Sequence, residues 1–506
     1  MKKSVKGIIG LSAALVVLGG SLAVLKLTEP DDSPDESSVS DITEVSGAGV
    51  VLVQDKNSGD GYGTVSKVRV TNRNGEVNAV IQNQPNENSA AVYTLEDYTD
   101  VPLDTSVIGT LAYNANGLAS SSIVAENCTE TEKYGFDDPE ASVEVTYESG
   151  NSVKFFIGDT APKASETYVM VDGDDTVYTV DTSKIANYSK TLYDFVSNTI
   201  VEKPADDQYP VVNSLRIQRD DIDYDIYLEY DKKSDDDSYT GGTSATHVMM
   251  EPTFSYLTVE KSTPITNGIF GLTAKSIYSV HAGEAEIAQA GLKEPFCKVT
   301  MNYGKDGSEY VLLMSEPFTD ENAQKLHYAM LEGGNVIYTV SAEDAQWGTI
   351  KPIDISSKII FGTFIWNISD MTVKCSGQDL NFKVSPKDAS KETSSLKSED
   401  MNVTKNDSVF DAERYRSFYS FLVLASAEDF ALGEEIPSGV PMASVEFRDS
   451  YTEETTKVEF YDYSSLNSLI VINGESKYFC GKSYVETLIE NIKRIETGEE
   501  YLTTWK

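Results

Sequence analysis

The chain has 506 residues and a formal net charge of −40, from 81 acidic and 41 basic residues. This charge argues against nucleic acid as a partner, because phosphates select surfaces rich in Lys and Arg, and against docking onto an anionic membrane surface. Hydrophobic residues make up 40% of the chain, enough to bury a core over most of its length, and the length itself indicates about three domains.

The N-terminus has the pattern of a membrane anchor. Lysines precede an uncharged stretch from Gly7 to Leu25, and acidic residues follow it. A helix of that length, at a rise of about 1.5 Å per residue, spans roughly the hydrocarbon core of a bilayer. The positive-inside rule places the N-terminus in the cytoplasm and the remaining chain outside. We therefore expect residues 1–27 to form a single-pass transmembrane helix; a signal peptide cleaved near Ser21-Leu22-Ala23 is the alternative.

A spacer and three repeats are expected after the anchor. Residues 28–50 are rich in Asp, Glu, Ser and Pro, which predicts a disordered acidic spacer. A pattern then recurs roughly every 150 residues, long enough for a folded module. The predicted repeats are residues 51–205, 206–365 and 366–506, and the third is the most divergent. Each is expected to be an α+β unit of mainly antiparallel sheet with packed helices.

The recurrence is clearest in one predicted hairpin. The segment Tyr168–Val180 returns as Tyr328–Val340, and a looser copy runs from Leu469 to Tyr478. Glycine, tyrosine and alternating apolar residues are kept between the copies, whereas the carboxylates of Asp172–Asp175 are largely lost. The hairpin is therefore interpreted as a structural core and its acidic tip as a turn.

The first repeat opens with a β-hairpin signature, an alternating strand from Val65, a turn at 72–75 and a second strand to Ile81. A helix is expected from Asp104, with either Asp104 or Thr105 as its N-cap. The remaining predicted elements are strands at 142–147 and 153–157, the hairpin at 168–180, and a closing helix over 185–196.

The second repeat is expected to follow the same order, with opening strands at 215–217 and 224–228. Residues 265–280 have helical or mixed character. Ala290–Pro295 then matches Tyr134–Pro139, with Gly permitting a bend and Pro disfavouring helix before the next strand.

The third repeat opens with strands at 371–373 and 380–384. The polar stretch Lys387–Asp407 is predicted to be a mobile insertion. A helix is expected over Arg414–Leu424, and a closing helix from Tyr484 to a stop at Gly498.

Candidate chemistry is sparse. The segment Asp55–Gly61 resembles a calcium loop, but its ligand spacing is wrong and a polar turn explains it better. The acidic patch Asp220–Asp225 could hold a divalent ion weakly, although a solvated edge strand is the simpler interpretation. The three histidines, His247, His281 and His327, lack a catalytic motif and are expected to be ordinary surface or loop residues.

The four cysteines do not form a recognisable site. They lie far apart and lack zinc spacing, so they are expected to be small apolar residues near strands; they are Cys128, Cys297, Cys375 and Cys480. We predict no catalytic residue, no cofactor and no metal, and the sequence does not indicate the oligomeric state.

Three segments together resemble a known family. They are the Tyr-Gly-Phe-Asp-Asp-Pro entry at 134–139, the Phe-Phe-Ile-Gly-Asp stretch at 155–159, and the hairpin at 168–180. The chain resembles the DUF4340 family of bacterial envelope proteins, most clearly over Val65–Val201, less over Val212–Phe361 and weakly beyond. Members often accompany ABC-transporter components linked to gliding motility or other export, and the family has no established catalytic residues to carry over.

The resemblance and the anchor together imply a membrane-anchored, extracytoplasmic and non-enzymatic protein. We expect an accessory or interaction subunit of an ABC-type transport or export system, with permease or ATPase subunits as partners. The alternative is a cell-wall or glycan-binding surface protein that uses tyrosine-rich sheet faces. An envelope hydrolase is the least supported alternative.

Overall fold

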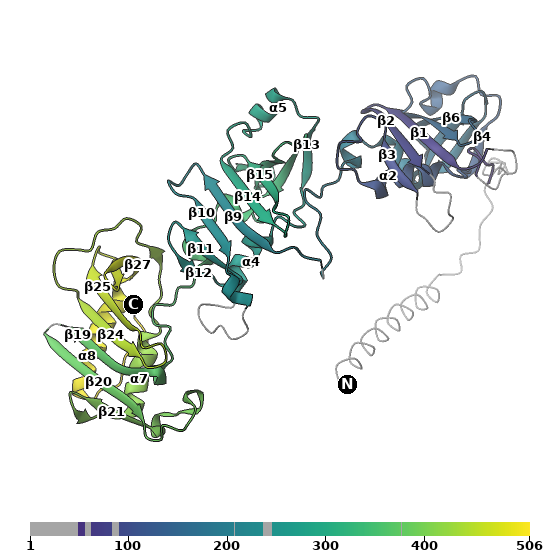
Figure 1. Cartoon of the computed structure of the whole chain (residues 1–506). Coiled ribbons are helices and arrows are strands. Elements are labelled where there is room, and N and C mark those ends of the chain that lie inside the picture. Colours follow the sequence, from purple (N-terminus) through teal and green to yellow (C-terminus); the bar gives the residue numbers. More distant parts are fainter. Residues whose placement is uncertain are drawn as a thin grey trace, which may run out of the picture.

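In a computed structural model, the protein is an elongated row of three antiparallel β-sheets with few helices (Figure 1). The structure describes residues 49–55, 62–82, 91–206, 208–235, 245–375 and 377–505. The predicted α+β class is confirmed. The anchor predicted at 1–27 and nearly all of the spacer predicted at 28–50 lie outside the described residues. Within those residues, no helix is long and apolar enough to cross a membrane.

We call each sheet with its helices a module, numbered along the chain. Across the sheet of module one, the strands are β3 (Val92–Leu95), β2 (Gly75–Gln82), β1 (Val65–Asn72), β5 (Ala141–Tyr147), β6 (Ser152–Thr160), β7 (Glu166–Val171), β8 (Val177–Asp181) and β4 (Ser122–Ala125). In module two they are β12 (Ser255–Tyr256), β11 (His247–Glu251), β10 (Ile226–Tyr230), β9 (Val212–Arg219), β14 (Cys297–Tyr303), β15 (Ser308–Met314), β17 (Lys325–Leu331), β18 (Val336–Ser341) and β13 (Ser276–Val280), with β16 (Phe318–Thr319) beside β17. In module three they are β22 (Ser408–Val409), β21 (Met401–Lys405), β20 (Gln378–Pro386), β19 (Ile368–Cys375), β24 (Ala443–Asp449), β25 (Thr455–Asp462), β26 (Asn467–Ile472), β27 (Glu475–Gly481) and β23 (Asp429–Phe430).

The three sheets share one strand order. An opening hairpin lies near the centre, a four-strand meander pairs with the other side of its first strand, and a short strand closes the far edge. One helix follows the opening strands in each module: α2 (Thr105–Ala115), α4 (Val259–Asn267) and α7 (Ala412–Leu422). The third repeat, divergent in sequence, therefore keeps the topology of the other two.

Helical segments complete each module. They are η1 (Thr131–Tyr134), α3 (Thr182–Ile185), η2 (Ala186–Ser189) and η3 (Leu192–Phe195) in module one; η4 (Lys232–Asp235), α5 (Glu284–Gln289), η5 (Gln346–Gly348) and α6 (Pro352–Ile355) in module two; and η6 (Ile365–Asn367), η7 (Thr393–Ser395), η8 (Ser398–Asp400) and α8 (Lys482–Thr497) in module three.

Local sequence explains many of these elements. Along β5 the burial alternates, because Val143 and Val145 face the core while their polar neighbours face outward. The carboxylate of Asp104 accepts hydrogen bonds from the amides of Ser106 and Val107 at 3.0 and 3.1 Å, which caps α2 as predicted. The predicted hairpins and closing helix α8 are also present, and Gly498 ends α8 with a positive φ of 81°.

Two structural predictions were wrong. The stretch Lys387–Asp407 is not merely an insertion, since its residues Met401 and Val403 are buried in β21, which pairs with β20. The closing helix of module one is broken into α3, η2 and η3. The carboxylate of Asp194 accepts hydrogen bonds from the amide and hydroxyl of Thr191, both at 2.8 Å, so a new helical turn starts there.

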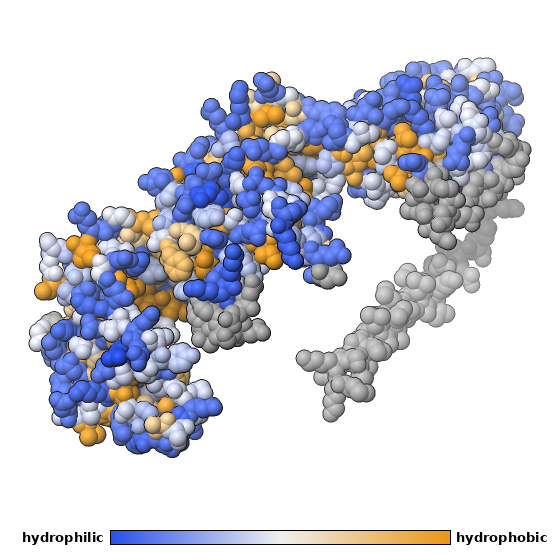
Figure 2. All heavy atoms as spheres, viewed as in Figure 1, coloured by the Kyte–Doolittle hydropathy of each residue, from blue (hydrophilic) through white to orange (hydrophobic). Residues whose placement is uncertain are grey.

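Each module has a buried core, and the modules are joined by further contacts. Module one has its own apolar cluster, whereas one continuous cluster runs through modules two and three. Between modules one and two, Asp100 contacts Nε2 of His281 at 2.9 Å, and the His281 ring stacks on Tyr98 with centroids 5.0 Å apart. Hydrophilic residues cover most of the face shown in Figure 2, in keeping with the high net charge.

Candidate binding groove

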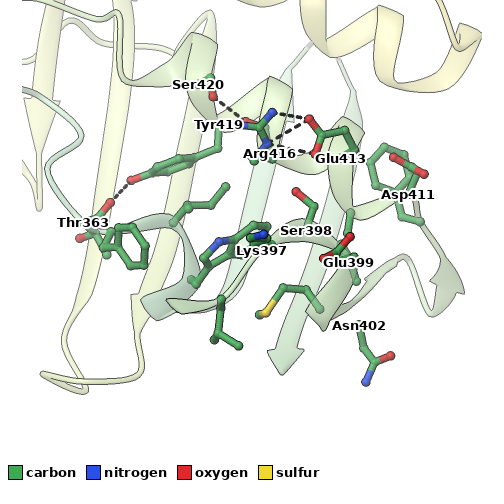
Figure 3. Close-up of a pocket in the computed structure, with 18 of the residues that line it drawn as sticks. Thr363, Lys397, Ser398, Glu399, Asn402, Asp411, Glu413, Arg416, Tyr419 and Ser420 are labelled. Atoms are coloured by element: carbon green, nitrogen blue, oxygen red, sulfur yellow. Dashed lines mark hydrogen bonds and ion pairs between the residues drawn. The ribbon is translucent and has the colours of Figure 1, made fainter. Parts of the chain in front are cut away.

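Module three contains a groove of about 1810 Å³ (Figure 3). It is formed by the segment 359–366 that enters the module, by Lys387 and the stretch 396–404 with η8 and β21, and by β22 with the whole length of α7. One side of α7 faces the groove, because Ala412, Arg416, Tyr419 and Val423 recur at helical spacing. A small-molecule site usually measures about 300–1,000 Å³, so this groove has room for a peptide segment.

Large apolar side chains around the groove are open to solvent. The exposed fractions are 94% for Val409, 62% for Ile359, 47% for Phe364 and 44% for Val423. Deeper in the groove, the side chains of Trp366 and other lining residues are buried. Contiguous exposed apolar surface of this kind marks an interaction site more often than a free surface.

The polar groups of the groove mostly hold one another in place. The guanidinium of Arg416 donates to both carboxylate oxygens of Glu413, and Ser420 donates to the Arg416 carbonyl at 2.9 Å (Figure 3). Hydrogen bonds from Arg416 and then Ser398 lower the pKa of Glu413 to about 2. Tyr419 donates to the carbonyl of Thr363 and so ties α7 to the entering segment.

This arrangement suits binding better than proton transfer. Glu413 is held ionised by Arg416, and Asp411 accepts from the Arg414 amide at 2.8 Å as the N-cap of α7. Neither a histidine nor a cysteine is among the described lining residues. Lys397 and Glu399 line the groove and are exposed. Neither side chain forms an ion pair among the described residues, so both remain able to bind a ligand.

A second feature, in module one, concerns the residues that carry the family resemblance. The segment Tyr134–Pro139 packs against the end of β6 at two glycines. A Cβ on Gly158 would lie 2.1 Å from the carbonyl oxygen of Tyr134, and Gly135, at a φ of +82°, lies against Asp159. Neither glycine leaves room for a side chain, so this signature is a packing lock between two segments.

Residues 94–244 match the family model of DUF4340, a domain of unknown function. The predicted resemblance is therefore confirmed over this stretch. The DUF4340 match starts in β3 and ends in module two, after β10. It is therefore about as long as one repeat, but its ends do not coincide with the ends of a module. No curated protein and no solved structure matches the chain. The groove lies outside the DUF4340 match.

Inside the DUF4340 match, the acidic patch Asp220–Asp225 is partly neutralised. Arg219 contacts Asp221 at 2.5 Å, and Arg216 contacts Asp225 at 2.7 Å and Glu251 at 2.8 Å. No group of three or more metal-binding side chains occurs in the part of the chain that the structure describes. The tip Asp172–Asp175 forms the predicted turn, in which Asp174 accepts from Thr176 and Tyr178 at 2.9 Å. The calcium-like segment lies outside the described residues from 56 to 61.

The prediction for the histidines was wrong in two of three cases. His247 and His327 are buried within strands, and burial lowers the pKa of both imidazoles. Nε2 of His247 contacts the carbonyl of Val212 at 2.9 Å, and Nδ1 of His327 contacts the carbonyl of Ser315 at 2.7 Å. Both histidines lie within strands that bury them, and the count of histidines in the sequence does not reveal this position.

The cysteines behave largely as predicted. Cys297, Cys375 and Cys480 are buried in strands, whereas Cys128 is half-buried outside them, and all four are free thiols. Burial raises the pKa of Cys297 and of Cys480 to about 12, which keeps both as unreactive thiols.

The groove itself was not predicted from the sequence. The apolar run between the second and third repeats, residues 359–366, was the available signal, because a link between modules is usually polar. This run forms a groove only together with α7 and β21, which lie beside it only in the folded protein.

Proposed function

We propose that this protein is a non-enzymatic, extracytoplasmic interaction subunit that binds a partner through the groove of module three. The open apolar groove is the observation that carries the proposal. Twelve of the 23 exposed large apolar residues in the described chain belong to positions 359–505, so module three exposes more of such surface than either of the other modules.

We further propose that the partner belongs to an ABC-type transport or export assembly. The support is the resemblance to DUF4340 proteins and the lysine-led apolar segment at the N-terminus, which would hold the modules outside the membrane. This link rests on family association and not on the geometry of the groove.

The experiment is affinity purification of the full chain from membranes in mild detergent, followed by mass spectrometry. Recovery of a permease or ATPase subunit is expected, and Val423→Glu should remove it, because a carboxylate would then lie in the apolar groove. Val440→Glu is the matched control, since Val440 is 91% exposed and does not line the groove. Equal recovery with both variants, or no transport subunit at all, would contradict the proposal.

A glycan-binding function is the alternative. The most exposed tyrosines, Tyr113 at 81% and Tyr451 at 77%, lie in different modules, whereas Tyr147, Tyr188 and Tyr415 are buried. A flat stacking platform for sugars therefore has less support than the groove. A glycan array with the full chain separates the two functions.

A further inference from the structure

The links between modules follow a rule that each module repeats. On entering a module, the chain pairs with the segment just after the module's helix. These antiparallel bridges are Val51 with Ala119, Thr199 with Thr273, and Ile359 with Ser426. Modules one, two and three therefore all receive the incoming chain in the same way.

On leaving modules one and two, the chain pairs with the residue just before the N-cap of that module's helix. The bridges are Leu103 with Val196, and Leu257 with Ser356. The outgoing segment thereby adds one more strand-like piece at the outer edge of the sheet, beyond β12 in module two.

The hydrogen bonds at these two exits are the same. In module one, the amide of the N-cap Asp104 donates to Phe195 at 2.9 Å, and the amide of Ser197 donates to Pro102 at 2.8 Å. In module two, Thr258 donates to Ile355 at 2.9 Å, and Ser357 donates to Tyr256 at 2.7 Å. At both exits a large buried apolar residue lies two positions before the serine. The pairs are Phe195 and Ser197 in module one, and Ile355 and Ser357 in module two.

Module three has the same edge, but among the described residues no outgoing segment pairs with it. Its N-cap is Asp411, so Phe410 and Val409 take the places of Leu257 and Tyr256. Among the described residues, neither the Asp411 amide nor the Val409 carbonyl has a backbone partner. We define Val409–Asp411 as the open edge, and all three residues line the groove.

The C-terminal segment, which takes the place of an exit link, follows another path. The amide of Leu502 donates to the side chain of Asn491 at 2.8 Å, and Arg414 donates to the carbonyls of Gly498 and Glu499 at 3.0 and 3.1 Å. These contacts hold the segment against α8 and the outer side of α7. Among the described residues, the C-terminal segment therefore does not pair with the open edge.

We infer that the open edge binds an extended segment of another protein as an added strand. The inference rests on the proposed function and names the class of partner. The partner segment carries a large apolar residue, whose carbonyl accepts from Asp411, and a small residue such as serine two positions later, whose amide donates to Val409. Strand addition of this kind combines backbone hydrogen bonds with side-chain pockets, and the groove supplies the pocket.

A second copy of this chain is not the expected occupant. The two described segments that carry the required pattern, around 195–197 and 355–357, are each already bound to their own module. Within one chain, such links bind at a high effective concentration, so they do not become free to exchange.

The test uses a fluorescent peptide with the sequence of residues 352–361, the segment that fills this position in module two. Saturable binding to the full chain in detergent is expected. Asp411→Pro should weaken it by about tenfold or more, because proline removes the backbone amide that donates to the peptide, and the φ of −67° at Asp411 already suits proline. Asp411→Ala is the matched control, because it loses the N-cap side chain that accepts from Arg414 but keeps the backbone amide.

A second peptide removes any dependence on folding of the variant. Methylation of the amide nitrogen of Ser357 in this peptide deletes the donor to the Val409 carbonyl. Binding should then fall about tenfold, the equivalent of one hydrogen bond of about 1.4 kcal/mol. Equal binding of both peptides, equal binding to Asp411→Pro and Asp411→Ala, or self-association of the chain through this edge would overturn the inference. Loss of peptide binding with retained recovery of transport subunits would refute only the strand addition, whereas the reverse result would refute only the transport function.

Discussion

The two glycines of the DUF4340 signature allow a quantitative prediction. A Cβ at position 158 would lie 2.1 Å from the Tyr134 carbonyl oxygen and 3.0 Å from the Phe136 ring, whereas ordinary contact begins at 3.4 Å. The oxygen is a backbone atom, so it cannot rotate away, and the segments must separate by about 1.3 Å. Overpacking of this size costs about 1–3 kcal/mol.

Thermal and urea unfolding of Gly158→Ala measure this cost. At about 2–4 °C per kcal/mol for a unit of this size, the melting transition of module one should fall by about 2–12 °C. Gly283→Ala is the control, because Gly283 has an ordinary φ of −82° and its nearest neighbour to a Cβ lies 3.9 Å away. A Gly158→Ala protein within about 0.5 kcal/mol of the wild type would refute the packing-lock interpretation.

Three further predictions follow from buried groups. Because burial lowers the pKa of His247 and His327, the stability of module two is fully present above the ordinary histidine pKa of about 6.5 and is lost as the pH falls below it. Urea unfolding at pH 7.5 and 5 should show this loss of stability, and His247→Gln should make the loss smaller. A flat pH profile would contradict the argument. Tyr188→Phe removes a buried hydroxyl that donates to a carbonyl of α2 at 3.0 Å, and should cost about 0.5–1.5 kcal/mol in unfolding free energy, whereas an unchanged midpoint would show that the bond contributes nothing. In the native protein a thiol reagent should modify Cys128 and spare Cys297; mass spectrometry of the labelled chain checks this, and rapid labelling of Cys297 would indicate that module two opens readily.

The open edge gives the repeat architecture a functional meaning. In a repeat protein each unit contacts its neighbours, and the last unit usually carries a cap. Here module three has a groove and, among the described residues, an edge without a backbone partner. The inferred partner segment would add one strand-like piece at this edge, as the outgoing links do in modules one and two.

Local patterns were enough for the hairpins and the capped helices. Alternation along β5 and the positive-φ glycine of the turn after α8 depend only on neighbouring residues, so the sequence predicts them. The strand β21 was missed because Met401 and Val403 are isolated apolar residues within a polar stretch. Only pairing with β20 makes that stretch a strand.

By itself, the sequence predicted a recurring module, its α+β class and a resemblance to DUF4340, which the family model matches over residues 94–244. These features follow from short-range periodicity and turn chemistry, which are written in consecutive residues. Tertiary structure alone decided that the divergent third module keeps the common strand order, that two histidines are buried, and that Val409–Asp411 is left open. Each of these depends on contacts between segments far apart in the chain, where no local pattern records which partner a strand, ring or edge will meet.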